Sequence, residues 1–307
     1  MANTIPCMKL NTGHSMPALG LGTWNYRLPG IYDAVKTAID VGYRHIDTAW
    51  VYESEADVGK AVKEKISEGV VSREDVFITT KLGNYFHDPD EVAVGLRESL
   101  DDLKTSYVDL YLMHWPVSLK KAARGVLADD TDYIDTWRAM EKLVDAGKAR
   151  AIGISNFNMA QVERLLQTDG LKYKPANLQI EMNPYITNTE LMQFCLEQGI
   201  SVTSYSPLTK GVADYQGEGT FNILEDDVVT KVARQHSRTP AQVVLRWTLQ
   251  RGCAVMVKSC SESRIRENFQ ICDFSLTNEE MAAITNLNIN QRLVKRDNMK
   301  SFPWYPF

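Results

Sequence analysis

The sequence predicts a (β/α)8 barrel, and three observations carry that prediction. Apolar runs of about four to eight residues alternate with helical stretches along the chain, and this alternation gives eight strand–helix units. Most of the runs are nearly continuous, which is typical of strands buried on both faces of a parallel sheet. The first strand region, LGLGTWNY, lacks the third glycine of a G-x-G-x-x-G motif, so an open doubly wound sheet is the weaker alternative.

A short hairpin is expected before the barrel, with one strand over residues 7–10, a turn over residues 11–13 and a return strand. The barrel strands are then expected in ALGLGTW from Ala18, HIDTA from His45, VFITTKL from Val76, VDLYLMHW from Val108, ARAIGISN from Ala149, ANLQIEMN from Ala176, SVTSYSPL from Ser201 and CAVMVKS from Cys253.

The segments between the strands have apolar residues at helical spacing and recognisable ends. Thr187 with Glu190, and Thr277 with Glu280, have the spacing of a capping box. Glycines end helices shortly before the next strand at Gly42, Gly69, Gly147, Gly170, Gly199 and Gly252.

Two connections, residues 116–132 and 209–227, are longer than a barrel needs, and an irregular tail with four aromatics begins at Ile289. We expect these loops and the tail to lie over the active-site face, because segments of this size usually shape a ligand site. The alternative is a surface excursion without a role. No break in composition divides the chain, so a single domain over residues 1–307 is expected.

Composition excludes several classes of protein. The apolar fraction of 44% and charged fraction of 24% are ordinary for a globular protein, and a net charge of −5 gives no long-range attraction to nucleic acid or anionic membrane. The sequence has no apolar N-terminal segment and no run long enough to span a membrane. The five cysteines are dispersed without a C-x-x-C pair, which argues against disulfides and zinc and favours the cytoplasm.

Ionisable side chains follow three neighbouring predicted strands, at the end of the barrel where functional groups gather. The second strand delivers Asp47, with Tyr52 in the turn after it, the third ends at Lys81 and the fourth at His114. Taken one at a time, each residue has an alternative structural explanation, as a capping aspartate, a packing tyrosine, a surface lysine and a hydrogen-bonded core histidine. Together on one rim they favour a reactive site, with Asp47 as the partner that a buried lysine requires.

These four groups suit proton transfer to a developing alkoxide, which the reduction of a carbonyl group needs. A phenol has an ordinary pKa of ~10, too high for efficient acid–base catalysis at neutral pH. A neighbouring ammonium group is expected to lower the pKa of Tyr52. Asp47 would keep Lys81 charged and in place, and His114 could donate a hydrogen bond to the same substrate oxygen.

The segments GYRHIDTA, ESEADVG, LMHWP, GISNF and YSPL resemble those of the aldo-keto reductase superfamily, and the likeness spans essentially the whole chain. The resemblance implies a barrel that uses NADPH without a Rossmann fold or a metal. It assigns the catalytic tetrad to Asp47, Tyr52, Lys81 and His114, with Tyr52 as the general acid. KLVDAGK and TPAQVVLRW also resemble fungal xylose reductases, which favours an aldose or xylose reductase-like, fungal-type aldehyde reductase.

The resemblance further implies which residues bind the cofactor. Ser155, Asn156 and Gln179 would bond the nicotinamide carboxamide, and Tyr205 would stack on the ring. The remaining positions that it assigns to the cofactor are Thr23, Trp24, Ser206, Leu208, Lys258, Ser259, Ser261, Arg264, Glu267 and Asn268.

The basic cluster in VKSCSESRIREN indicates a preference for NADPH over NADH. A strand-end lysine, two serines and an arginine at a helix N-terminus form an anion pocket suited to a 2′-phosphate. The alternative is an exposed basic turn.

The substrate pocket is expected to involve Trp24, Val51, Trp115 and Val294, with Phe302, Trp304 and Tyr305 offered by the tail. Gly83 stands where aldose reductases usually carry a tryptophan, so one wall is expected to be open. Val51 and Val294 occupy positions where xylose reductases grip sugar hydroxyls. Substrates with an apolar body are therefore favoured over open-chain sugars.

The leading interpretation is NADPH-dependent reduction of aldehydes, extending to ketones, by a monomer or weak homodimer whose partner is a small carbonyl compound. One alternative is a sugar or polyol reductase acting on xylose, glyceraldehyde or a uronate, of the glycerol dehydrogenase type. Another is a non-catalytic structural or regulatory barrel. A metal-dependent isomerase barrel is weaker, because the strand ends carry no set of metal ligands.

Overall fold

The computed structural model describes residues 4–24, 30–121, 126–209 and 222–307. Eight parallel strands form a closed barrel in which each strand pairs with the next barrel strand along the chain and the last pairs with the first. The strands are β3 (Leu19–Gly22), β4 (His45–Asp47), β5 (Phe77–Leu82), β6 (Leu110–Met113), β9 (Ile152–Ser155), β10 (Asn177–Glu181), β11 (Ser201–Tyr205) and β12 (Ala254–Lys258). The predicted (β/α)8 barrel and its strand positions are confirmed.

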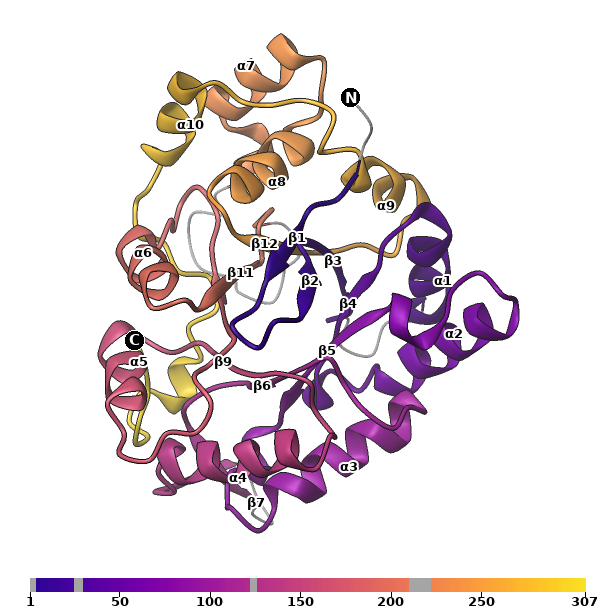
Figure 1. Cartoon of the computed structure of the whole chain (residues 1–307). Coiled ribbons are helices and arrows are strands. Elements are labelled where there is room, and N and C mark those ends of the chain that lie inside the picture. Colours follow the sequence, from indigo (N-terminus) through magenta and orange to yellow (C-terminus); the bar gives the residue numbers. More distant parts are fainter. Residues whose placement is uncertain (1–3, 25–29, 122–125, 210–221) are drawn as a thin grey trace.

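Helices surround the barrel (Figure 1). They are α1 (Ile31–Val41), α2 (Glu55–Ser67), α3 (Val92–Leu103), α4 (Tyr133–Asp145), α5 (Met159–Leu166), α6 (Thr189–Glu197), α7 (Asp227–His236), α8 (Pro240–Gln250), α9 (Glu262–Phe269) and α10 (Asn278–Thr285). Their apolar faces and the outward side chains of the strands form the main core, which explains why the strands are apolar on both faces.

The predicted N-terminal hairpin is present as β1 (Cys7–Lys9) and β2 (Ser15–Pro17). It lies across one end of the barrel, in front of the strands in Figure 1. Leu10 and Met16 are buried there against apolar side chains near the beginnings of the strands, including Phe77 and Leu110. This end is therefore closed, and the site lies at the opposite end.

One of the two predicted capping boxes is confirmed. The Thr277 hydroxyl accepts from the backbone N–H of Glu280, whose carboxylate accepts from the N–H of Thr277. The prediction at Thr187 is wrong, because α6 begins after Asn188, which has a φ of 44°. The Asn188 amide donates to the carbonyl of Glu181 instead, so a tertiary contact with β10 sets the start of this helix.

The first long connection contains a two-stranded hairpin, β7 (Ser118–Lys121) with β8 (Val126–Asp129). The glycine-bearing part of the second, with Gly211, Gly217 and Gly219, lies outside the described residues. The tail contains one short 3-10 turn, η5 (Asp297–Met299). No helix in the described ranges is long and apolar enough to cross a membrane.

Candidate active site

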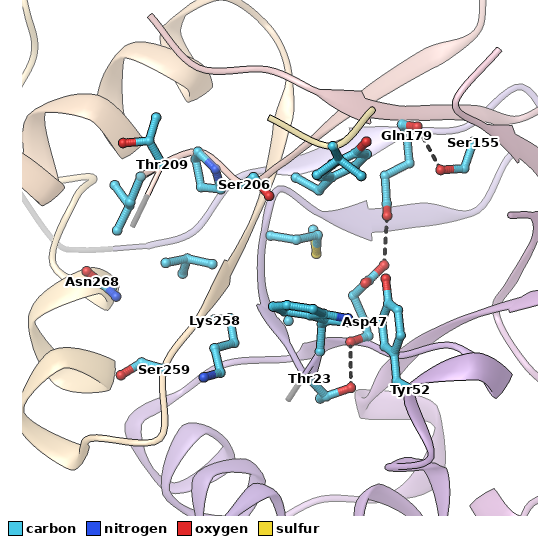
Figure 2. Close-up of a pocket in the computed structure, with 18 of the residues that line it drawn as sticks. Thr23, Asp47, Tyr52, Ser155, Gln179, Ser206, Thr209, Lys258, Ser259 and Asn268 are labelled. Carbon is cyan, nitrogen blue, oxygen red and sulfur yellow. Dashed lines mark hydrogen bonds between the residues drawn. The ribbon is translucent and has the colours of Figure 1, made fainter. Parts of the chain in front are cut away.

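A cavity of about 910 Å³ opens where the barrel strands end. Figure 2 shows Tyr52, Asp47 and Gln179 toward one end of it, and Lys258 and Ser259 toward the other. The residues predicted for the site line this cavity, except Ser261, the tail aromatics Phe302, Trp304 and Tyr305, and Lys81, which lies behind Asp47. Its volume is in the range of cofactor and small-molecule sites, roughly 300–1,000 Å³.

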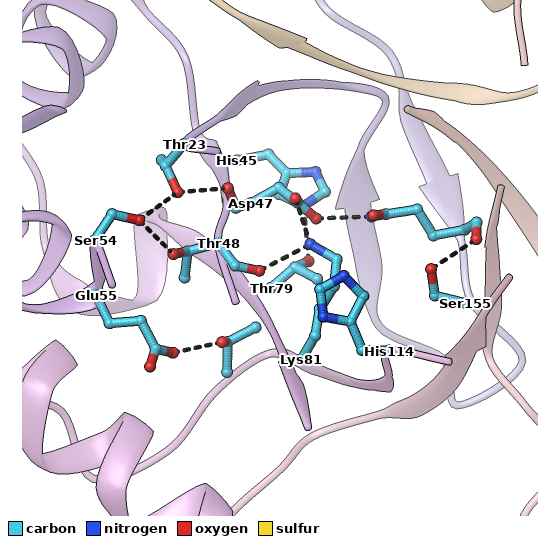
Figure 3. A network of polar contacts seen from close by, with 12 residues as sticks. Thr23, His45, Asp47, Thr48, Ser54, Glu55, Thr79, Lys81, His114 and Ser155 are labelled. Carbon is cyan, nitrogen blue, oxygen red and sulfur yellow. Dashed lines mark hydrogen bonds and ion pairs between the residues drawn. The ribbon is translucent and has the colours of Figure 1, made fainter. Parts of the chain in front are cut away.

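The predicted pair of Lys81 and Asp47 is confirmed. Lys81 is fully buried, and its Nζ donates to Asp47 Oδ1 at 2.6 Å and to the Thr48 carbonyl at 2.8 Å (Figure 3). Burial alone would lower the pKa of Lys81, but the charge of Asp47 and the hydrogen bonds to Asp47 and Tyr52 outweigh it and raise that pKa. The ammonium group therefore stays charged inside the barrel.

Asp47 has a second partner that sequence reasoning missed. Gln179 Nε2 donates to Asp47 Oδ2 at 2.7 Å, so both carboxylate oxygens accept a hydrogen bond. The hydroxyl of Thr23 donates to the backbone carbonyl of Asp47 at 3.1 Å. Gln179 was predicted for the cofactor alone, and its proximity to Asp47 follows only from barrel closure.

Tyr52 lies beside this ion pair, in the short turn η1 (Trp50–Tyr52), with Lys81 Nζ 4.9 Å from its ring centre. Burial raises the pKa of Tyr52 above its ordinary value, and the charge and hydrogen bond of Lys81 offset this only in part. The predicted net lowering is therefore wrong, although Lys81 acts in the expected direction. The phenol keeps its proton at neutral pH and can serve as a proton donor.

The His114 ring meets the Tyr52 ring edge-on, with ring centres 5.6 Å apart. Burial, followed by the positive charges of Lys81 and Arg296, holds the pKa of His114 well below its usual value. The imidazole is therefore neutral at physiological pH. It can donate a hydrogen bond to a substrate oxygen without competing as an acid.

Four of the predicted cofactor residues are joined by hydrogen bonds. The Asn156 amide nitrogen donates to the His114 carbonyl at 2.9 Å, and its oxygen accepts from the Tyr205 hydroxyl at 2.6 Å. Ser155 Oγ donates to the Gln179 carbonyl at 2.9 Å. These bonds hold the Tyr205 side chain at the cavity wall next to the tetrad.

The far end of the cavity is cationic. Lys258 and Arg264 line it, and in the described part of the chain neither has a carboxylate within 4 Å. α9 begins here, and Ser259 Oγ accepts from the backbone N–H of Ser261 at 3.1 Å. The Ser261 hydroxyl instead pairs with that of Ser263 outside the cavity lining, which does not support its predicted role.

Two expectations about the substrate wall are corrected. A Cβ on Gly83 would lie 2.7 Å from Cε3 of Trp50, so Trp50 fills the space that the glycine was expected to open. The tail aromatics do not line the cavity either. Trp304, for example, packs against Tyr133 and under the Arg164 guanidinium.

Comparisons with known proteins show which family the chain resembles over its length. The sequence pattern of the aldo/keto reductase family matches residues 18–289. This chain belongs to the aldo/keto reductase family. Human aldo-keto reductase family 1 member C2 is 44% identical over 100% of this chain and 99% of that protein. Mouse estradiol 17 beta-dehydrogenase 5 is 42% identical, over 98% and 97%. The solved aldose reductase of Schistosoma japonicum superposes with a TM-score of 0.91 at 40% identity, covering 99% of both chains.

As a family member, this aldo/keto reductase is an oxidoreductase that reduces carbonyl groups with a nicotinamide coenzyme. Sequence reasoning did not name every residue that lines the cavity, and one of those it missed is an arginine. Arg296, in the tail, lines the cavity together with Val294, and its charge acts on both Tyr52 and His114. The KR pair at 295–296 is visible in the sequence, but nothing in its spacing indicates that the arginine turns inward.

A buried carboxyl group lies one layer outside the tetrad of this reductase. Glu55, at the start of α2, accepts from Thr80 Oγ1 at 2.5 Å and from Ser99 Oγ at 3.0 Å. Burial raises the pKa of Glu55 to about 7, while the two hydroxyls oppose that shift. Thr80 precedes Lys81 on β5, so Glu55 links α2 and α3 to the strand that carries the lysine.

We expect Glu55 to make stability pH-dependent. Its folded pKa of about 7 exceeds the ordinary 4.5, so its stabilisation is complete below the unfolded pKa and is lost as pH rises through 7. From about pH 5 to about pH 8, the wild type should lose about 2–3 kcal/mol relative to Glu55→Gln, measured by urea unfolding. If the difference in unfolding free energy between the two proteins were the same at both pH values, the pKa of Glu55 would not be raised by folding.

Proposed function

We propose that this aldo/keto reductase uses NADPH to reduce aldehydes, and ketones with an apolar body, to alcohols, with Tyr52 as the proton donor. The observation that carries the proposal is the buried ion pair of Lys81 and Asp47 beside a protonated Tyr52 at the cavity wall. A buried charged pair is costly to maintain, and a phenol poised next to it has an evident chemical use.

The residues present fit the coenzyme. The cavity has a hydrogen-bonding group around Asn156 at one end, and at the other Lys258 and Arg264, which have no carboxylate within 4 Å among the described residues. In this proposal Ser155, Asn156 and Tyr205 hold the nicotinamide end, and the cations hold the 2′-phosphate. The bound coenzyme supplies the hydride to the carbonyl carbon.

The chain supplies the proton and the charge stabilisation. Tyr52 gives its hydroxyl proton to the substrate oxygen as negative charge develops there, and the ammonium group of Lys81 stabilises the phenolate that remains. Asp47 keeps Lys81 in place, and Gln179 fixes Asp47 in turn. Neutral His114 donates to the same substrate oxygen and orients it.

The walls near Tyr52 support an apolar substrate. Trp24, Val51, Trp115 and Val294 line this region, and apolar surface there rewards burial of a hydrocarbon or aromatic body. The name of the mouse relative, an estradiol dehydrogenase, supports including ketones.

Arg296 favours a second candidate, the reduction of aldehydes that carry a carboxylate, such as a uronate. In the described residues its guanidinium has no carboxylate within 4 Å, and it faces the same cavity as Tyr52. A cation in this position can hold an anionic group at the far end of the substrate.

A substrate panel with NADPH tests both candidates. We expect kcat/KM for benzaldehyde to exceed that for xylose by roughly 100-fold or more, because the lining offers little to open-chain hydroxyls. Comparable values would favour a sugar reductase, and no NADPH oxidation with any carbonyl would favour a non-catalytic barrel. If Arg296 recognises carboxylates, Arg296→Leu should lower kcat/KM for 4-carboxybenzaldehyde about 10-fold and spare benzaldehyde.

A further inference from the structure

The carboxylate of Glu181 holds the C-terminal tail at the mouth of the cavity. Its two oxygens accept from consecutive backbone N–H groups of the tail, Leu293 N at 2.8 Å and Val294 N at 2.9 Å. Glu181 is the last residue of β10 and is fully buried, so these bonds join the rim of the barrel to a segment more than 100 residues away in sequence.

The position of this contact ties it to the site. Val294 donates one of the two bonds and also lines the cavity, and Arg296 lines it two residues later. On β10, Gln179 stands two residues before Glu181, and residues at this spacing project to the same side of a strand. Gln179 bonds Asp47, so one strand end holds both the tetrad carboxylate and the tail.

The carboxyl group of Glu181 depends on the docked tail for its hydrogen bonds. Among the described residues no cationic group lies within 4 Å of it, and the two tail N–H groups are the hydrogen-bond donors to its carboxylate. Burial raises the pKa of Glu181, whereas the N–H groups of Val294 and Leu293 and the more distant charge of Arg292 oppose that shift. Undocking the tail would leave a buried carboxylate without donors, which is strongly unfavourable.

We propose that Glu181 is a positioning residue for substrate binding, which fixes Val294 and Arg296 at the cavity mouth by clamping the tail backbone. The proposal rests on the proposed function, because it assigns the tail a role in holding the carbonyl compound. The other hydrogen bonds that hold the tail lie on both sides of this contact. The backbone N–H groups of Ile289 and Gln291 donate to the Tyr185 carbonyl before it, and Asn158 and Gln161 donate to the carbonyls of Pro306 and Trp304 at the far end.

The test is Glu181→Gln, which keeps the size of the side chain but replaces one acceptor oxygen by a donor facing a tail N–H. We expect KM for benzaldehyde to rise about 10-fold or more, while the affinity for NADPH, measured by fluorescence quenching, changes less than about twofold. Hydrogen exchange at the amides of Leu293 and Val294 should become faster in the same variant.

Glu141 provides a matched control. It is a buried glutamate on α4 whose carboxylate also accepts from two consecutive backbone N–H groups, those of Lys172 and Tyr173 at 2.8 and 2.9 Å, away from the cavity. Both bonds go to Oε1, so Glu141→Gln removes a buried carboxylate that accepts from backbone N–H groups away from the cavity, and it should leave KM unchanged. An equal rise of KM in both variants, or an unchanged KM and tail exchange in Glu181→Gln, would overturn the proposal.

Two further outcomes, a Glu181→Gln variant that does not fold and a wild type without reductase activity, call for separate measurements. If Glu181→Gln does not fold, Leu293→Pro removes the N–H that donates to Glu181 Oε1 and leaves the carboxylate in place, and the same rise in KM is expected. Normal KM in that variant would overturn the clamp. If the wild type reduces no carbonyl compound, the proposed function fails, whereas tail exchange in Glu181→Gln still tests whether Glu181 holds the tail.

Discussion

Replacing Tyr52 by Phe is expected to reduce kcat for aldehyde reduction about 10²–10⁴-fold, the usual contribution of a positioned general acid. The substitution removes only the hydroxyl, so the ring still packs edge-on against His114 and the ion pair of Lys81 and Asp47 remains. NADPH should bind as it does to the wild type and quench the protein fluorescence to the same extent. Steady-state kinetics with benzaldehyde, combined with a fluorescence titration, check the two statements together.

Tyr43→Phe is the control for this substitution. Tyr43 is also buried, but its hydroxyl donates to the Ile265 carbonyl at 3.2 Å outside the cavity, so its loss should leave kcat unchanged. Because burial raises the pKa of Tyr52, the rate of reduction should also be insensitive to the ionisation of Tyr52 across neutral pH, since the protonated donor predominates there. Near-normal turnover of Tyr52→Phe would refute its role as proton donor.

The barrel and the convergence of the tetrad could be predicted because both follow from local pattern. Nearly continuous apolar runs predict parallel strands, and the carboxyl ends of parallel strands share one rim. Asp47 and Lys81 therefore had to lie close together once each was placed at a strand end. The bond from Gln179 to Asp47 could not be foreseen, because it spans the closed barrel over 132 residues of sequence.

The expectations that failed depend on tertiary packing. Gly83 reads as an open wall only while the position of Trp50 is unknown, and the Thr187 capping box competes with the bond from Asn188 to Glu181. The tail has no regular periodicity, so its sequence shows neither that Trp304 turns away from the cavity nor that Arg296 turns into it. Its conformation is set by partners elsewhere in the chain.

The predicted direction of the pKa shift at Tyr52 was wrong for a related reason. Sequence reasoning recognised the charge of Lys81 but not the depth of burial, and desolvation is the larger effect on the phenol. The same burial keeps His114 neutral. A site deep at the end of a barrel thus favours proton donors in their neutral form, beside one ammonium group that is kept charged by Asp47.

Arg264→Ala is expected to raise KM for NADPH about 10–100-fold while changing KM for NADH by less than about twofold. A hydrogen bond to a charged group contributes roughly 1.5–3 kcal/mol, and only NADPH carries the 2′-phosphate that would accept this bond. Arg264 lines the cationic end of the cavity near Lys258 and the start of α9, where it can meet an anion. The measurement is initial rates with each coenzyme at saturating benzaldehyde.

The matched control is Arg266→Ala, two residues further along the same helix. Arg266 pairs with Glu262 at 2.8 Å on the exposed side of α9 and does not line the cavity, so the loss of its charge should affect neither coenzyme. This comparison separates local recognition of a phosphate from a general loss of positive potential, since both variants change the net charge of −5 by the same amount. An equal effect of Arg264→Ala on KM for both coenzymes would contradict a 2′-phosphate site and favour the alternative interpretation of the cluster as an exposed basic turn.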